Sequence, residues 1–168
     1  MRRTISLILL IGSAILLQTT LFAEIRLLGA KPELLYLVTI ALALLEGPAK
    51  GAVAGFFCGM AQDFMLNQPK GITALTLTLL GYAIGLGRTY IVSASPLLPT
   101  MLVALATFGG VVFYGTVSFL LGQLGTDFGY LVRVALLTGL YGGLLTPIAF
   151  PVIRRLSETS KPRRVVRF

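Results

Sequence analysis

Very few side chains in this sequence could carry out chemistry. Its 168 residues include no histidine, one cysteine and six Asp and Glu residues. This composition excludes His-dependent nucleophilic triads, intramolecular disulfides and metal clusters of cysteine or histidine. General acid–base catalysis needs several titratable groups positioned in one pocket, and Asp63 is the one plausible acid within an apolar segment beside a glycine-rich face. We therefore expect no catalytic residues, no bound metal and no cofactor.

A row of glycines precedes Asp63. The row recurs at every fourth position and consists of Gly47, Gly51, Gly55 and Gly59, with Asp63 at the next step. Each step of four residues advances about 40° beyond a full helical turn, so the row winds slowly around a helix and offers a path that a crossing helix could follow. Glycine favours such close approach in membranes, where lipid gives no hydrophobic drive for helix association. The row predicts packing within the chain, contact with a helix of another protein, or the lining of a cavity.

Asp63 itself needs a partner if it lies in a membrane. An ionised acid at the centre of a membrane helix costs about 2.5–3.5 kcal/mol, and such acids are usually paired or functional. Asp63 comes just before Asn67, Pro69 and Lys70, at the end of its apolar segment. Two roles are open. In a structural role, Asp63 pairs with Lys70 or caps the next helix, and in a functional role it recognises a partner or ligand.

The elements that position these residues are apolar helices. The sequence is 56% apolar and 12% charged, whereas a soluble domain usually has about twice this charged fraction. Because every backbone polar group in lipid must be bonded internally, apolar stretches separated by charges, Pro and Gly are interpreted as helices. We therefore predict an all-α polytopic integral membrane protein. Its roughly six transmembrane helices are Thr4 to Ala23, Pro32 to Glu46, Gly47 to Phe64, Gly71 to Gly87, Leu98 to Leu121 and Leu131 to Ile153.

The second and third of these segments are short for spanning helices. Each has an uncharged stretch of about 12 residues, which covers about 18 Å of a hydrocarbon core about 30 Å thick. They cross the membrane only if flanking charges such as Glu46 and Lys50 reach an interface or face protein. A re-entrant hairpin between residues 32 and 64 therefore stays open as the alternative to two full spans.

The basic residues indicate the orientation of the chain. The sequence has 14 Lys and Arg and a formal net charge of +8, and cytoplasmic loops of membrane proteins are enriched in basic residues. Six spans with a cytoplasmic N-terminus leave four of these residues outside: Arg26, Lys31, Lys70 and Arg133. We therefore expect a multi-pass protein with both termini in the cytoplasm.

The chain is expected to divide at residue 153 into a transmembrane helical domain, residues 1–153, and a basic cytoplasmic tail, residues 154–168. The basic residues of the tail are Arg154, Arg155, Lys161, Arg163, Arg164 and Arg167. Each basic residue near an anionic inner leaflet contributes about 1 kcal/mol. The tail is therefore expected to anchor the topology beside anionic lipid, with binding to a cytoplasmic partner or a specific lipid as the alternative. We expect no nucleic-acid binding, because no aromatic platform accompanies the charges.

The order of these motifs resembles one known family. The residues that carry the resemblance are Gln18 to Phe22, Pro32 to Leu35, Gly47, Gly51, Gly55 to Asp63, Gly71 to Leu75, and Gly81 with Tyr82. In this order they are similar to the bacterial rod shape-determining protein MreD family, most closely between about Gln18 and Gly87.

The resemblance implies a non-enzymatic component, in the bacterial inner membrane, of the machinery that builds the side wall during elongation. Members of the family associate with the single-span scaffold MreC and, with it, connect MreB filaments to the RodA glycosyltransferase and a penicillin-binding transpeptidase. Their fold is similar to that of the substrate-binding subunits of energy-coupling-factor transporters. A substrate-binding membrane subunit of a vitamin or small-molecule transporter is therefore the alternative function. Under the first function, the glycine row with Asp63 is expected to help form the contact with MreC.

Overall fold

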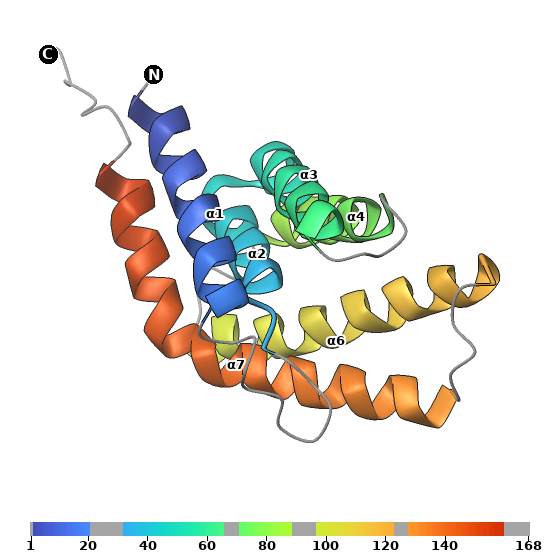
Figure 1. Cartoon of the computed structure of the whole chain (residues 1–168). Coiled ribbons are helices and arrows are strands. Elements are labelled where there is room, and N and C mark those ends of the chain that lie inside the picture. Colours follow the sequence, from blue (N-terminus) through green and yellow to red (C-terminus); the bar gives the residue numbers. More distant parts are fainter. Residues whose placement is uncertain (1, 21–31, 66–70, 89–96, 123–127, 160–168) are drawn as a thin grey trace, which may run out of the picture.

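The computed structural model describes residues 2–20, 32–65, 71–88, 97–122 and 128–159. Within these residues the chain forms six helices (Figure 1): α1 (Arg2–Thr20), α2 (Leu34–Glu46), α3 (Pro48–Met65), α4 (Ile72–Leu86), α6 (Leu97–Leu120) and α7 (Phe128–Thr159). Each helix corresponds to one of the predicted spans. The prediction of an all-α fold is thereby confirmed.

The helix bounds follow the glycines and prolines of the sequence. α2 ends at Glu46 and α3 begins at Pro48, so Gly47 alone joins them. Gly47 has a φ of 94° and Gly71, which precedes α4, has a φ of 106°, a region that favours glycine because it has no Cβ. Proline suits the first position of α3 because the N–H that it lacks would have no partner within the helix.

The last helix is longer than predicted. α7 continues to Thr159 with Pro147 and Pro151 inside it, whereas the sequence analysis places its end at Ile153. Neither proline ends the helix, although each lacks the N–H that would bond the carbonyl four residues earlier. Figure 1 shows that α7 is bent, with its first half beside α6 and its second half beside α1. Residue 153 therefore lies inside a continuous helix, and the division into a transmembrane domain and a basic cytoplasmic tail stays a prediction.

α2 is the centre of the bundle. Every side chain from Leu34 to Leu44 is buried, and α2 contacts each of the other five described helices. A helix that is apolar on all sides is expected to be buried in this way. Its 13 residues cover about 20 Å, less than the core of a bilayer. The polar ends of α2 therefore need hydrogen-bonding partners within the protein.

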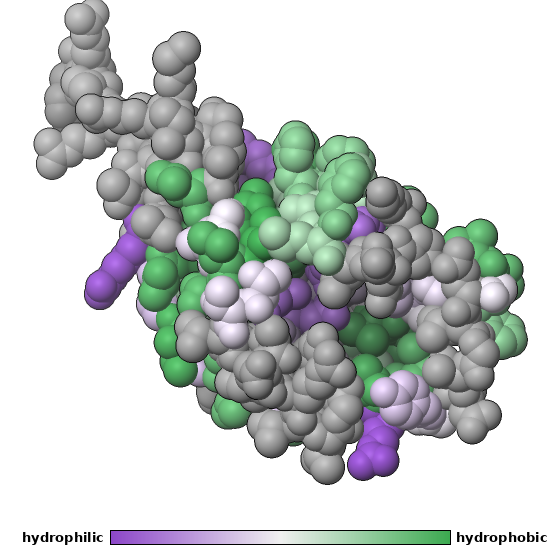
Figure 2. Space-filling model, in the orientation of Figure 1, coloured by the Kyte–Doolittle hydropathy of each residue, from purple (hydrophilic) through white to green (hydrophobic). Residues whose placement is uncertain are grey.

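The outside of the bundle is also apolar. α6 and α7 contain stretches long and apolar enough to cross a membrane, Leu98–Leu120 and Gly129–Arg155, while α1, α2 and α4 contain shorter apolar stretches. Exposed large side chains recur at every fourth position of α7: Leu136, Leu140, Leu144, Ile148 and Val152. Figure 2 shows hydrophobic side chains over much of the coloured surface. Such a surface suits contact with lipid.

Candidate functional site

The glycine row lies against α4. Gly51, Gly55 and Gly59 are all buried. A Cβ on Gly51 would lie 2.6 Å from the carbonyl oxygen of Gly81, and a Cβ on Gly55 or Gly59 would overlap backbone atoms of α4. Real side chains do not come this close, so each of these positions requires glycine. The row thus allows direct contact between the backbones of α3 and α4.

α4 contributes glycines of its own to this contact. A Cβ on Gly81 would overlap the backbone of Gly51, and a Cβ on Gly85 would overlap that of Pro48. The sequence shows Gly81 and Gly85 four residues apart, but the spacing does not say which helix they face. Packing within the chain accounts for the row, and α4 occupies the face that the sequence analysis offers to MreC. The contact of this row with MreC stays a prediction, and the structure shows the row packed within the chain.

Gly47 has a different role from the rest of the row. Its N–H donates a hydrogen bond of 2.9 Å to the carbonyl oxygen of Ala43 and ends α2. Beside this turn, Nζ of Lys50 lies 3.2 Å from Oε2 of Glu46. A Cβ on Gly47 would lie 3.5 Å from Nη1 of Arg88, just after α4. The turn therefore gathers three charged side chains at one end of α2, α3 and α4.

Asp63 caps the start of α4. It is 1% exposed, and its Oδ2 accepts hydrogen bonds from the N–H groups of Gly71 (2.7 Å) and Ala74 (3.2 Å). Gly71 stands at the N-cap position and has no side chain with which to bond these amides. Asp63, on the preceding helix, supplies the missing acceptor. Of the roles left open by the sequence, the structure shows the helix cap, whereas Lys70 lies outside the described residues.

Gln18, near the end of α1, caps the start of α2 in the same way. Its Oε1 accepts a hydrogen bond of 3.2 Å from the N–H of Leu35, in the first turn of α2. The N-cap residue of α2 is Glu33, whose side chain makes no capping bond. From the sequence, Gln18 contributes to the family resemblance alone, and no cap is predicted there. A polar amide at the end of an apolar helix is the one sequence feature that could have suggested it.

Two tyrosines lie near these caps. Tyr36 in α2 is buried, and a Cβ on Gly110 of α6 would lie 2.6 Å from its Cε1, so glycine makes room for the ring. Tyr36 and Tyr114 both lie within electrostatic range of the carboxyl groups of Glu33 and Asp63. In the described part of the chain, no group of three or more His, Cys, Asp or Glu could hold a metal ion. The polar side chains Gln18 and Asp63 accept hydrogen bonds from backbone amides at the starts of helices.

The basic residues of the predicted tail are partly described. Arg154 and Arg155 lie exposed near the end of α7. Lys161, Arg163, Arg164 and Arg167 lie outside the described residues. The predicted contact of this segment with anionic lipid stays a prediction.

Long apolar helices with an apolar exterior, and polar side chains used to cap helix ends, define a polytopic helical membrane protein. The sequence profile of the rod shape-determining protein MreD family matches residues 1–157. The chain belongs to this family, which assigns it to rod-shape determination and confirms the resemblance seen in its first half. No curated protein and no solved structure matches the chain. The similarity to energy-coupling-factor subunits stays a prediction.

Proposed function

We propose that this protein is a non-enzymatic component of the machinery that builds the side wall of elongating bacteria. In this role it binds the single-span scaffold MreC and, through that complex, acts with MreB, RodA and a penicillin-binding transpeptidase to organise peptidoglycan synthesis. The observation that carries the proposal is the family match over residues 1–157. The use of Gln18 and Asp63 as helix caps supports it, because these polar groups serve the fold.

The proposed location is the bacterial inner membrane, with both termini in the cytoplasm. Two observations support it. The start of α1 and the end of α7 lie at the same end of the molecule (Figure 1), as an even number of crossings requires. Arg154 and Arg155 at the end of α7 are basic, as is typical of cytoplasmic segments. The antiparallel pair of α2 and α3 is compatible with two spans and with a re-entrant hairpin.

The contact with MreC is proposed to lie on an exposed apolar face of the bundle. α4 covers the glycine row, whereas large side chains on other faces are open to the surroundings. On α3, the exposed rings of Phe56 and Phe57 pack edge to face with centroids 5.7 Å apart. On α7, the exposed leucines form a continuous ridge. Lipid tails are as apolar as the side chains of these helices, so there is no hydrophobic drive for association. Close packing of side chains between the helices therefore provides the affinity.

Photo-crosslinking tests this proposal. A crosslinking amino acid is placed singly at exposed positions of four helices, Phe56, Leu79, Phe113 and Leu144, and the protein is co-expressed with MreC of the same bacterium. We expect MreC to co-purify and at least one position to crosslink to its membrane segment. An unrelated single-span protein at the same expression level is the control. The proposal is refuted if MreC is not recovered and none of the four positions crosslinks to it above that control.

A further inference from the structure

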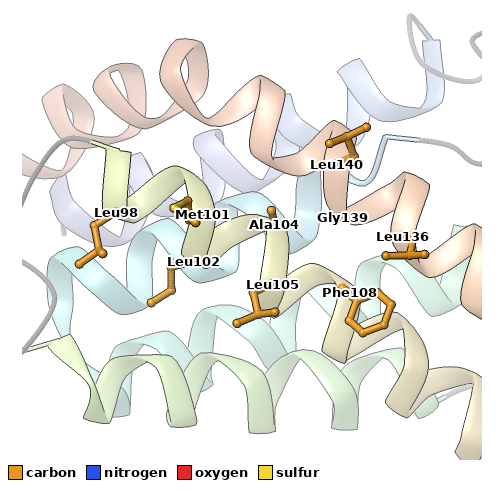
Figure 3. Close-up of a pocket in the computed structure, with 9 residues that line it drawn as sticks. All are labelled: Leu98, Met101, Leu102, Ala104, Leu105, Phe108, Leu136, Gly139 and Leu140. Atoms are coloured by element: carbon orange, nitrogen blue, oxygen red, sulfur yellow. The ribbon is translucent and has the colours of Figure 1, made fainter.

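An apolar groove of about 660 Å³ lies between α6 and α7. Figure 3 shows the nine residues that line it, all of them apolar, from Leu98 at the start of α6 to Phe108, and from Leu136 to Leu140 on α7. Its volume lies within the range of about 300–1,000 Å³ that is usual for small-molecule sites. A molecule that fills it has to be apolar along its whole bound length.

Small residues form the floor of the groove and leucines form its sides. A Cβ on Gly139 would lie 2.7 Å from the carbonyl oxygen of Ala104, so α6 and α7 approach each other closely there. Leu105 on α6 and Leu140 on α7 are 73% and 66% exposed and stand on opposite helices (Figure 3). A channel of this shape suits a flexible hydrocarbon chain, which can follow its contour.

The groove is about half as long as the hydrocarbon core of a bilayer is thick. Leu98 and Phe108 are ten residues apart on α6, which corresponds to about 15 Å along the helix axis. The hydrocarbon core of a bilayer is about 30 Å thick. An acyl chain occupies one leaflet, whereas the membrane helix of a protein crosses both. The length of the groove therefore favours a lipid chain over a partner helix.

The relative direction of α4 and α6 shows which end of the bundle the groove reaches. Leu80 in the second half of α4 lies close to Gly110 in the middle of α6. Figure 1 shows that α4 runs from right to left in the view and α6 from left to right. The two helices are therefore antiparallel, and the start of α6 at Leu98 lies on the same side as the end of α4.

That side of the bundle carries a net positive charge. Arg88 follows the end of α4, and the ion pair of Lys50 with Glu46 lies at the adjacent turn. The three groups together carry one excess positive charge, which complements a phosphate. We infer that the groove binds one acyl chain of an anionic phospholipid, with the phosphate on the side of Arg88. In the topology proposed above, Arg88 lies on the cytoplasmic side, so the bound lipid belongs to the inner leaflet. The leaflet rests on that proposed topology, whereas the preference for an anionic lipid does not.

The absence of tryptophan from the sequence makes a direct test possible. Leu105→Trp places a single fluorophore at the groove, and Leu144→Trp is the matched control, because Leu144 is equally exposed (72%) on α7 and does not line the groove. Each purified variant is reconstituted into phosphatidylcholine vesicles that contain a small fraction of acyl-brominated phosphatidylglycerol. Bromine quenches tryptophan at short range. We expect the effective local fraction of the brominated lipid to be about fivefold higher at Leu105→Trp than at Leu144→Trp, the enrichment that corresponds to one nearby basic residue.

Two further measurements identify the occupant. Brominated phosphatidylcholine should quench the two variants equally, and Arg88→Gln in the Leu105→Trp background should remove the excess quenching by the anionic lipid. Equal quenching of the two positions by brominated phosphatidylglycerol would overturn the inference, since the groove would then hold bulk lipid. Protection of Leu105→Trp from quenching by added MreC would also overturn it, because the groove would then be a protein contact. The vesicles of the first measurements lack MreC, so failure of lipid binding leaves the proposed function intact.

Discussion

Replacing Asp63 by alanine or by asparagine separates its structural role from a functional one. Asp63 is buried, and its Oδ2 accepts the N–H groups of Gly71 and Ala74 at the start of α4. Alanine removes both the acceptor and the charge. Asparagine keeps an acceptor oxygen in the same place and removes the charge. The two variants should therefore differ strongly if Asp63 acts as a cap.

The expected size of the effect follows from the two lost hydrogen bonds. A buried donor left without an acceptor costs about 1–3 kcal/mol, and loss of an N-cap acceptor costs about 0.5–2 kcal/mol. A negative charge near a helix N-terminus contributes about 0.3–1 kcal/mol. We expect Asp63→Ala to lower the free energy of unfolding by about 2–4 kcal/mol and Asp63→Asn to lower it by about 1 kcal/mol.

Thermal unfolding of the purified protein in mild detergent measures the difference. At about 2–4 °C per kcal/mol for a chain of this size, Asp63→Ala should lose roughly 5–15 °C in Tm and Asp63→Asn a few degrees. In a rod-shaped bacterium that lacks its own family member, Asp63→Asn should restore rod shape. Equal loss of Tm in both variants would refute the capping argument. Normal Tm with round cells for Asp63→Asn would instead assign Asp63 to partner or ligand recognition.

Three more predictions follow from the described contacts. Gly55→Leu should lower Tm by roughly 6–20 °C, the effect of about 3–5 kcal/mol, because its side chain would overlap α4. Gly12→Ala, with open space around it, should leave Tm unchanged or raise it slightly. Gln18→Ala should cost about 1 kcal/mol in the same assay, because it removes the acceptor for the N–H of Leu35; an unchanged Tm would contradict this cap. Ala49 is exposed at the α2–α3 turn, and Ala49→Cys is made in a chain whose native cysteine is replaced by serine. The new thiol should react with an impermeant reagent from the cytoplasmic face of the membrane, which inverted vesicles expose to the medium. Reaction from the opposite, periplasmic face would contradict six spans.

Much of the helical architecture could be predicted because its boundaries have local causes. Gly47 and Pro48 mark the turn between α2 and α3, and the predicted and observed bounds there agree closely. α7 continues six residues beyond the predicted end at Ile153, through Arg154 and Arg155, and it also contains Pro147 and Pro151. In lipid, a helix tolerates proline when neighbouring groups satisfy the freed carbonyls. Sequence composition alone does not reveal those neighbours.

The site was predictable in its residue types but not in its contacts. The spacing of Gly51, Gly55 and Gly59 correctly indicates close packing, but a helix of the same chain and a helix of another protein impose the same requirement. Asp63 was recognised because a charge in an apolar segment is unusual. Gln18 was not, because the amide that it caps lies 17 residues away and no local pattern links the two. The groove depends on how α6 and α7 cross, which no periodicity in either helix determines.

The two caps change how the length of α2 should be interpreted. The doubt about whether α2 spans the membrane assumes that both helix ends have to reach water, since unsatisfied amides in lipid cost several kcal/mol each. The first turn of α2 receives an acceptor from Gln18 on α1, and that of α4 receives one from Asp63 on α3. α2, with 13 residues, can then begin inside the apolar layer. Neighbouring helices enclose it, and Gln18 provides an acceptor for an amide of its first turn. The short length of α2 therefore does not count against six spans, and the capping bond from Gln18 is compatible with the buried position of α2 at the centre of the bundle.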